Sequence, residues 1–475
     1  MRDQSKSMKN VLADRYGSDE MKSIWSPEAK ILAERRLWIE IMKSQAALGI
    51  DIPAAAIEKY ESVSKVINLE SIDAREKTLR HDVKARIEEF NALAGFEFIH
   101  LGLTSRDLTE NIEIVQIRDS LHLIRREVLA LLKKLNEKSL QYADLAIVGR
   151  SHNIPAQITT LGKRFASASE ELLFAFARLE SIIDRLPLRG IRGPVGTAQD
   201  GIDYLETAQR HQQLEGALAV GLGFDQILDS TGQIYPRSID FEVVSTLVQV
   251  ASGPSSLATS IRLMAGAELI AEGFKAGQVG SSAMPHKMNT RSSERVNGLS
   301  VVLRGYLSMV SELAGDQWNE GDVACSVVRR VALSDSFFAL DGLLQTSIVI
   351  LDELVIFEGA IDREISRQLP FLASTRILTE AVKKGMGREG AHKIIKEYAV
   401  KAVDEMRTTG SHQFIRELGA DQEFLLSEDD LNKILGDRAS FFGGAKDQVV
   451  RISERINKTL TKYSELKPFT PNTIR

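Results

Sequence analysis

The ten-residue stretch Gly280-Ser281-Ser282-Ala283-Met284-Pro285-His286-Lys287-Met288-Asn289 is small, polar and led by a glycine. Glycine permits sharp turns and Pro285 fixes one, so the stretch can present amides, hydroxyls and an ammonium group to one point. Apolar residues at helical spacing follow it, at Val296, Leu299, Leu303, Tyr306, Val310 and Leu313. A helix capped by Asn289 or Thr290 would turn its positive end toward the stretch, which favours anions. From these residues alone, the stretch is either an anion-binding loop or a plain surface loop between two core helices.

The size and composition of the chain fit a globular protein. It has 475 residues, of which 43% are hydrophobic and 26% are charged. A net charge of -5 gives no overall basic field, so we expect no binding to nucleic acid or membrane. Cys325 is the only cysteine, which excludes an intrachain disulfide and favours a reducing cytoplasm. Residues 1–10 lack the apolar segment of a signal peptide, and no uninterrupted apolar run approaches the roughly 20 residues of a membrane span.

Long apolar seams dominate the middle of the chain. Two of them step by three and four residues: Ile117, Leu121, Ile124, Val128, Leu131 and Leu135, and then Phe165, Ala168, Leu172, Ala175, Leu179 and Ile182. Such seams are typical of long helices packed at shallow angles. Three more long helices are expected: residues 239–274 with a kink or break at Gly253-Pro254, the helix after the quoted stretch, and residues 325–354. Strand-like stretches are too few for a sheet, so the sequence predicts an all-α bundle.

Shorter helices are expected on both sides of this bundle. Ser26-Pro27-Glu28 has the cap, the first-turn proline and the acid that begin a helix, which we expect to reach about Gly49. Residues 186–235 are richer in glycine and proline and are predicted to form loops and short helices that cap the bundle. Glycines again punctuate the chain after Phe357. We therefore expect three helical domains, at 1–106, 107–357 and 358–475.

Histidines are the first candidates for chemistry. None of the eight lies in an HExxH pattern, and neither zinc-site nor nucleotide-loop spacing occurs, so we expect no metal. Four of them lie on charged helical stretches and are predicted to be surface residues: His122, His211, His392 and His412. His152 precedes a polar segment, 155–160, that we expect to enter a bundle helix. From its residues alone, His152 is a hydrogen-bonded group at a helix end.

Three stretches together resemble the fumarase/aspartase superfamily, whose members eliminate fumarate from a substituted succinate. The stretch from Gly280 to Asn289 resembles the superfamily signature. Thr104-Ser105-Arg106-Asp107 resembles the first conserved region, whose hydroxyls hold a substrate carboxylate, and residues 149–160 resemble the second, where a histidine lies beside the leaving group. One departure is Thr290, because many members have proline there, and this changes how the following helix begins.

Five further stretches resemble the adenylosuccinate lyase family within that superfamily: Arg15-Tyr16, Arg80-His81-Asp82, and residues 99–105, 231–235 and 326–330. The resemblance covers nearly the full length. It implies that fumarate is eliminated from adenylosuccinate to give AMP, and from the succinylated carboxamide ribotide SAICAR to give AICAR, in purine biosynthesis. No cofactor is implied. The resemblance also implies a homotetramer with a twenty-helix core, in which three chains contribute to each active site.

The resemblance assigns roles by position. Ser281 is implied as the general base, acting as an alkoxide in a cationic nest that excludes water, and His152 as the general acid. Lys287 would stabilise the intermediate, Glu294 would orient the lysine or the histidine, and His81 is a further candidate for the chemistry. The implied substrate-binding positions are Arg15, Tyr16, Arg80, His81, Asp82, His100, Thr104, Ser105, Gln233, Ser282, Lys287, Asn289, Arg295, Ser326 and Arg330.

Within that set, Arg15, Tyr16, Arg295, Ser326 and Arg330 are implied to hold the nucleotide, chiefly its phosphate. The family usually has Glu-Arg where this chain has Glu320-Gly321, so its phosphate grip rests on fewer cations.

Two alternative functions compete with this one. Another superfamily member, such as a carboxymuconate cycloisomerase or an argininosuccinate lyase, is disfavoured by Arg15-Tyr16 and Arg80-His81-Asp82, since those substrates carry no phosphate. A structural protein that keeps the fold without the chemistry is disfavoured by the joint presence of four residues: His152, Ser281, Lys287 and Glu294.

Overall fold

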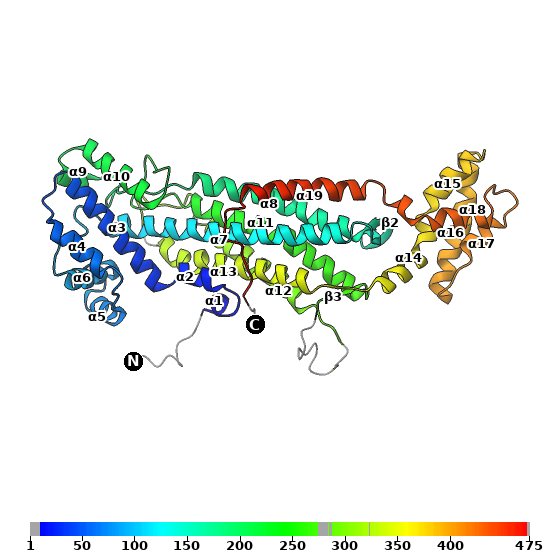
Figure 1. Cartoon of the computed structure of the whole chain (residues 1–475), viewed down its shortest axis with the longest axis horizontal. Coiled ribbons are helices and arrows are strands. Elements are labelled where there is room, and N and C mark those ends of the chain that lie inside the picture. Colours follow the sequence, from blue (N-terminus) through cyan, green and yellow to red (C-terminus); the bar gives the residue numbers. More distant parts are fainter. Residues whose placement is uncertain (1–9, 274–283, 285–286, 323, 473–475) are drawn as a thin grey trace.

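The computed structural model describes residues 10–273, 284, 287–322 and 324–472. Within these residues lie nineteen α-helices, α1 to α19, and only four short strands. They form an elongated molecule in which a long helix bundle joins two smaller helical ends (Figure 1). The prediction of an all-α fold is confirmed.

The N-terminal end of the molecule consists of six helices. Ser26 Oγ accepts the amide of Ala29 at 3.1 Å and Pro27 begins α3, so this helix starts where its capping residues predicted. Trp38 stacks on Phe90, whose ring also meets the edge of Tyr60, and these aromatic rings fill the local core. The helices are α1 (Val11–Arg15), α2 (Asp19–Ile24), α3 (Pro27–Ala47), α4 (Ala54–Val63), α5 (Leu69–Leu79) and α6 (Asp82–Ala94).

The central bundle contains the five predicted long helices. They are α7 (Ser105–Gln141), α8 (Leu161–Arg185), α11 (Ser238–Gly266), α12 (Arg291–Ser311) and α13 (Ala324–Glu353). Every residue of the first predicted seam is buried, and so are all residues of the second except Ala168, which is partly buried. The apolar spacing therefore identified the faces that meet in the core.

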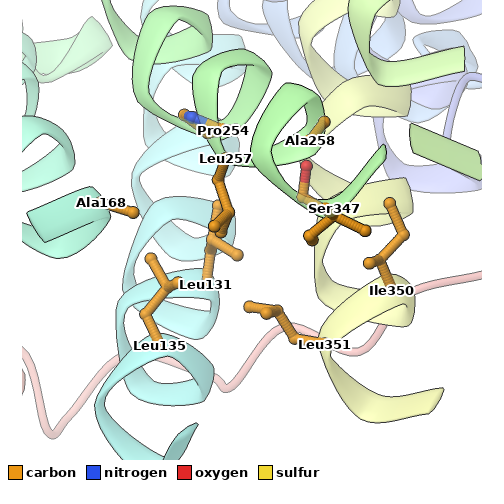
Figure 2. A pocket seen from close by; sticks show the side chains of 10 residues that line it. Leu131, Leu135, Ala168, Pro254, Leu257, Ala258, Ser347, Ile350 and Leu351 are labelled. Atoms are coloured by element: carbon orange, nitrogen blue, oxygen red, sulfur yellow. The ribbon is translucent and has the colours of Figure 1, made fainter. Parts of the chain in front are cut away.

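Of the kink or break expected at Gly253-Pro254, the break is excluded, because α11 runs through Pro254 without interruption. A proline inside a helix removes one hydrogen bond, but Pro254 is buried where α7, α8, α11 and α13 meet (Figure 2). The gap between these helices holds about 10 Å³, room for about one water molecule, and its lining is mostly apolar. This gap is therefore no ligand site.

The helix also ends earlier than expected, at Gly266. Glu268 has a positive φ of 60° and the amide of Leu269 donates to the carbonyl of Met264, which turns the chain out of the helix. Strand β3 (Ile270–Ala271) follows and pairs antiparallel with β4 (Val355–Ile356), which ends the bundle at that point.

The polar segment 155–160 does not enter a helix but forms a strand. Strand β2 (Ile154–Thr160) pairs antiparallel with β1 (Ala146–Ser151) directly after α7, and α8 begins only at Leu161. Thr160 Oγ1 caps α8 by accepting the amide of Lys163 at 3.1 Å. His152 therefore lies in a hairpin turn, so its interpretation as a helix-end group is wrong.

Short elements complete both ends of the bundle. As predicted for residues 186–235, α9 (Gln199–Leu205) and α10 (Ala208–Leu222) lie there among loops. Within the expected third domain, α15 (Ser374–Lys383), α16 (Arg388–Thr409), α17 (Phe414–Gly419) and α18 (Glu428–Gly436) have a separate small core. The buried residues of α14 (Glu358–Leu372) belong to the main core, and the last helix, α19 (Ala445–Lys462), packs along α7 and α8 (Figure 1).

One helix among the described residues, α13, is long and apolar enough to pass as a membrane span by composition. Of its most apolar window, 83% is buried inside the fold, which is the pattern of a core helix.

Candidate active site

A cleft of about 810 Å³ lies between the N-terminal helices and one end of the bundle. We call it the anion pocket. It brings together seven of the predicted substrate-binding residues from four separate segments of the chain. They are Arg80, His81, Asp82, Ser105, Gln233, Ser326 and Arg330.

Four helices begin at the wall of the anion pocket. Its lining includes Ser26-Pro27 at the start of α3, His81-Asp82 at the start of α6, Ser105 at the start of α7 and Ser326 in the first turn of α13. A helix N-terminus carries unpaired amide groups and roughly half a positive charge. Four of them at one cleft create an environment that favours a ligand with several negative charges.

Side-chain charges add to this field. Lys30, Arg80 and Arg330 line the pocket, and their side chains make no ion pair or hydrogen bond with any described residue. Two of the three acids on the wall are paired with arginines, and Glu76 is the third. Burial raises the pKa of Asp82, but Arg86 at 3.2 Å outweighs it and lowers that pKa. Arg329 likewise outweighs burial and lowers the pKa of Glu113 to about 2.

His81 is fixed in one tautomer by its backbone contact. Its Nδ1 accepts the amide of Lys84 at 3.2 Å, which caps α6. When the ring is neutral, the proton must then be on Nε2. His81 is therefore a hydrogen-bond donor toward the pocket rather than a proton acceptor.

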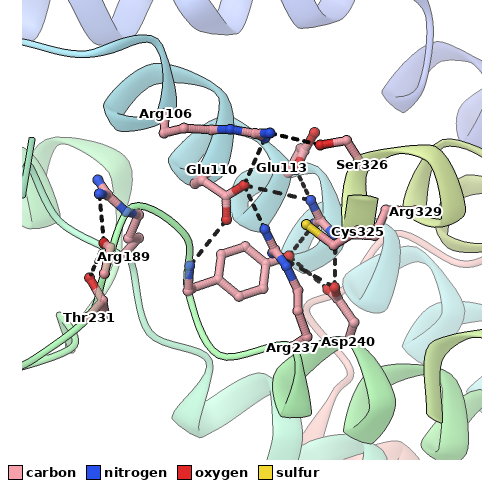
Figure 3. Close-up of polar contacts among 12 residues, drawn as sticks. Arg106, Glu110, Glu113, Arg189, Thr231, Arg237, Asp240, Cys325, Ser326 and Arg329 are labelled. Atoms are coloured by element: carbon pink, nitrogen blue, oxygen red, sulfur yellow. Dashed lines mark hydrogen bonds and ion pairs between the residues drawn. The ribbon is translucent and has the colours of Figure 1, made fainter. Parts of the chain in front are cut away.

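A buried ionic network fixes the wall of the pocket (Figure 3). Glu110 on α7 accepts from Arg237 at 2.8 Å and from the amide of Tyr235 at 3.2 Å. Asp240 on α11 accepts from Arg329 of α13 at 2.7 Å and from the Tyr235 hydroxyl at 2.7 Å. Burial raises the pKa of Tyr235 well above its usual value, so the phenol stays neutral. These bonds fix α7, α11 and α13 relative to one another.

The loop that carries Thr104 and Ser105 is held from within. Asp107 Oδ2 accepts the amide of Thr104 at 2.7 Å and completes a capping box at the start of α7. Its Oδ1 accepts from Arg189 at 2.5 Å, and both side chains are fully buried. The same oxygen accepts the amides of Arg192 and Gly193 at 2.8 and 3.0 Å.

A second group of predicted residues lies on the other side of α13. The guanidinium of Arg295 is 5.6 Å from the centre of the Tyr16 ring, and Arg15 is the exposed neighbour of Tyr16. Tyr16 packs on Gly342. A Cβ added at Gly342 would lie 2.6 Å from the Cβ of Tyr16. At 1.5 Å per residue, Gly342 is about 24 Å along α13 from Ser326. Within one chain, Tyr16 and Arg295 therefore do not reach the anion pocket.

The start of α12 differs from expectation. Ser281 and Ser282 lie outside the described residues. The carboxylate of Glu272 accepts the amides of Ser292 and Ser293 at 3.0 and 2.7 Å, so an internal acid occupies the positive helix end that was expected to attract a substrate anion.

Lys287 and Glu294 do not lie on one helix. Lys287 is exposed and precedes the helix, which begins only at Arg291, while Glu294 is exposed in its first turn. Asn289 is partly buried in the segment between them.

His152 is exposed at the tip of the β1–β2 hairpin. It and Asn153 have φ of 51° and 63°, the conformation of a type I′ turn, which is uncommon for residues other than glycine. Arg150 supports the tip by donating to the carbonyl of Asn153 at 3.2 Å and by pairing with Glu364. The imidazole makes no contact with any described residue that would occupy either nitrogen.

The whole length of α7 separates His152 from Ser105. This helix has 37 residues and is therefore about 55 Å long, with Ser105 at its first residue and β1 beginning shortly after its last. One chain alone cannot place both residues on one substrate molecule.

Two other histidines have structural surroundings. His100 Nδ1 accepts from Trp38 Nε1 at 3.1 Å, and burial lowers its pKa to about 4. It does not line the anion pocket. His211, predicted to lie on the surface, is buried, because Gly201 lacks a side chain and α9 approaches so closely that a Cβ there would lie 2.8 Å from the imidazole.

Two pocket residues were given no role by sequence reasoning. Lys30 reads as an ordinary charged position on a helix, and Arg106 lies within the stretch Thr104-Ser105-Arg106-Asp107 but was assigned no contact; the packing of α3 and α7 brings both to the cleft. Glu272 was equally inconspicuous. Among the residues that the structure describes, no cluster of three or more His, Cys, Asp or Glu side chains could hold a metal ion.

Comparison with known sequences extends over the whole chain. A family described as "Lyase" matches residues 17–305, and "Adenylosuccinate lyase C-terminus" matches residues 370–452. Adenylosuccinate lyase of Saccharomyces cerevisiae is 31% identical over 464 residues, which cover 96% of each protein. Adenylosuccinate lyase of Archaeoglobus fulgidus is 30% identical over 454 residues, 94% of this chain and 98% of the archaeal protein.

Solved structures share the fold. The 3-carboxy-cis,cis-muconate lactonizing enzyme from Pseudomonas putida has a TM-score of 0.82 at 20% identity, covering 95% of this chain and 99% of that one. A fumarate lyase from a Mesorhizobium species has a TM-score of 0.80 at 21% identity, covering 93% and 98%. The predicted fumarase/aspartase-like architecture is confirmed.

Proposed function

The chain belongs to the adenylosuccinate lyase family, so its reaction is the elimination of fumarate from adenylosuccinate to give AMP, and we propose how its residues divide that work. The bond that breaks joins the purine amino nitrogen to a carbon of the succinyl group. A base must take a proton alpha to a carboxylate, and an acid must protonate the departing nitrogen. The negative charge that develops on the carboxylate must be held by groups already in place.

The nucleotide binds in the anion pocket, with its phosphate on Ser326 and Arg330. The observation that carries this proposal is the meeting of four helix N-termini with three unpaired cations at one cleft. Arg80, His81, Asp82 and Gln233 line the purine, and His81 donates a hydrogen bond through Nε2. A carboxylate of the succinyl group is held by Thr104 and Ser105.

Ser281 is the general base. An ordinary hydroxyl is too weak for this proton, so the serine must act as an alkoxide beside positive groups. Glu272 already occupies the first amides of α12. The stabilising charge therefore comes from Lys287, with Asn289 as a further donor, rather than from that helix end.

His152 is the general acid. Its unoccupied nitrogens and its exposed position at a turn with positive φ leave it able to protonate the leaving nitrogen of a substrate held elsewhere. We expect the same groups to cleave SAICAR to AICAR, because that substrate carries the same succinylamino group beside a ribose phosphate.

The active form is a homotetramer whose sites are shared between chains. In one chain the anion pocket and His152 lie at opposite ends of α7, about 55 Å apart, so a second chain must supply the missing group. The bundle also leaves large apolar side chains exposed on several helices, as expected of surfaces that a second bundle covers. They include Phe174, Leu263, Val301 and Val331, with Ile154 beside His152.

The buried thiol of Cys325, the single cysteine, also favours a reducing compartment, and we propose the cytoplasm.

The first experiment follows adenylosuccinate by ultraviolet absorbance with the wild-type protein, Ser281→Ala and Ser282→Ala. The wild type should release AMP and fumarate. Ser281→Ala should abolish turnover yet bind substrate within about tenfold of the wild type, because the base acts only in the transition state. Ser282→Ala is the matched control. Near-normal turnover by Ser281→Ala would transfer the role to Ser282.

The second experiment mixes two inactive variants. His152→Gln and Ser281→Ala should each be nearly inactive, and dissociating and re-mixing them should restore both native loops in about a quarter of the sites. A verified mixed tetramer that regains no activity would reject the shared site.

A further inference from the structure

One cation of the anion pocket has no role in the assignment above: Arg106, the second residue of α7. Its Nη2 donates to Ser326 Oγ at 2.7 Å, and its Nη1 donates to Glu110 Oε1 at 3.2 Å (Figure 3). The side chain is 15% exposed. Arg106 thus joins the first turns of α7 and α13 at the wall of the pocket.

The positive charge of Arg106 is only partly neutralised. Glu110 is also bonded to Arg237 at 2.8 Å and lies 3.8 Å from Arg329, so three guanidinium groups share one carboxylate. The other two acids of the network, Glu113 and Asp240, are paired with Arg329. Arg106 therefore keeps positive charge available to a ligand in the pocket.

The contact with Ser326 completes a set of donors. Because Ser326 Oγ accepts an N–H of Arg106, its own hydroxyl hydrogen is free to donate. Arg330 lies one helical turn further along α13 on the same face and is unpaired among the described residues. A hydroxyl and two guanidinium groups beside two helix N-termini suit a phosphate dianion.

We propose that Arg106 is a ligand of the substrate phosphate, together with Ser326 and Arg330; this rests on the proposed function of the anion pocket. N–H groups of Arg106 that bond neither Glu110 nor Ser326 donate to phosphate oxygens. Glu110 keeps the guanidinium oriented, and Arg106 in turn orients the Ser326 hydroxyl.

Two other roles for Arg106 predict different measurements. As a structural tie between α7 and α13, it would affect every ligand of the pocket and the stability of the fold. As a ligand of a succinyl carboxylate, like its neighbour Ser105, it would affect fumarate and not AMP.

The test compares ligands with and without phosphate. In the full-length protein, dissociation constants of AMP, adenosine and fumarate are measured for the wild type, Arg106→Gln and Arg106→Lys. Arg106→Gln should raise the dissociation constant of AMP about tenfold or more and leave that of adenosine within about twofold of the wild type. Its KM for adenylosuccinate should rise more than its kcat falls. Arg106→Lys should recover part of the AMP affinity, since it keeps the charge and loses the planar fork.

Arg178→Gln is the matched control. Arg178 also joins two helices through a serine, donating to Ser245 Oγ at 2.6 Å, but it does not line the anion pocket. Its AMP affinity should equal that of the wild type.

The proposal is overturned if Arg106→Gln weakens the binding of AMP and adenosine equally, if it weakens only the binding of fumarate, or if it changes no dissociation constant. Should Arg106→Gln fail to fold, Arg106→Lys and Ser326→Ala decide between the same outcomes. A wild-type protein that neither binds AMP nor cleaves adenylosuccinate would instead remove the proposed function, so the two failures are distinguishable.

Discussion

The two ends of α7 are built in opposite ways. At its first turn, Asp107 and Arg189 are fully buried and the anion pocket is assembled by bonds within one chain. Beyond its last turn, His152 stands exposed on a two-residue turn and contacts no described residue through its ring nitrogens. The first end forms a binding pocket within a single chain, whereas the second end exposes His152.

This difference separates binding from chemistry. A pocket that is fixed before substrate arrives holds the ground state and the transition state alike, which lowers KM more than it raises kcat. In the proposed shared site, a histidine supplied by another subunit acts on the reacting bond alone. Variants at the two ends should therefore change different measured quantities.

The largest effect is expected from His152→Gln. Loss of a general acid should lower kcat about a hundredfold to ten-thousandfold. AMP affinity and melting temperature should stay close to wild type, because the imidazole is exposed and its nitrogens bond to no described residue. Asn153→Gly is the matched control, since glycine accepts the φ of 63° and keeps the turn. A fall in melting temperature for His152→Gln would remove the contrast between the two ends.

Asp107→Ala should affect stability instead. It leaves Arg189 buried without its carboxylate and deprives the amides of Arg192 and Gly193 of their acceptor. Breaking a buried pair of this kind costs about 3–5 kcal/mol, measured by urea or thermal unfolding. Asp107→Asn keeps a hydrogen-bond acceptor without the charge, so its free energy of unfolding should fall less than that of Asp107→Ala. If Asp107→Ala unfolded like the wild type, the pocket would not depend on its internal network.

Arg330→Ala tests the pocket as a binding surface. It should raise KM for adenylosuccinate about tenfold or more and change kcat much less, because a phosphate contact is mostly uniform binding. Arg330→Lys, which retains the charge, should lie between the two. The effect should be strong here, since the resemblance predicts an arginine at position 321 and this chain has Gly321 with a φ of 150°. An unchanged KM would make Arg330 structural.

The sequence was sufficient for the long helices and insufficient for the sites between them. Apolar spacing marks a buried helix face locally, so the seam from Ile117 to Leu135 could be read directly. The hairpin was missed because His152-Asn153 lacks the glycine that usually marks such a turn. His211 was misjudged because its burial depends on Gly201, a residue of another helix.

The site shows the same limit. Resemblance placed Arg80, Ser105 and Ser326 in one set, and the structure brings them to one cleft. It also grouped Tyr16 and Arg295 with Ser326. Within one chain, however, Tyr16 packs on Gly342, which lies about 24 Å along α13 from Ser326, and Arg295 lies beside Tyr16. A set of site residues carries no information about which chain supplies each one. The lengths of the helices that separate the residues show which of them cannot meet within one chain.

The smallest expected effect lies midway along α7, where Glu127 is buried beside Asp341. Burial first, and then the neighbouring carboxylate, raise the pKa of Glu127 well above its usual value, so this side chain is protonated in the fold. Asp341 also accepts the amide of Ser18, two residues after Tyr16, and so connects this pair to the N-terminal segment.

A raised pKa makes the stabilising contribution of Glu127 complete at low pH. It is lost as the pH rises from the unfolded value near 4.5 toward the folded one, because the unfolded chain releases the proton first. Glu127→Gln cannot titrate. The free energy of unfolding of the wild type should therefore fall relative to this variant as the pH rises above about 5, by at most about 1.4 kcal/mol per pH unit. Glu137→Gln, at a half-exposed position of the same helix, controls for the loss of one charge. Parallel melting curves for wild type and Glu127→Gln would mean that Glu127 is ionised in the fold, and the middle of α7 would then carry a buried charge like its first turn.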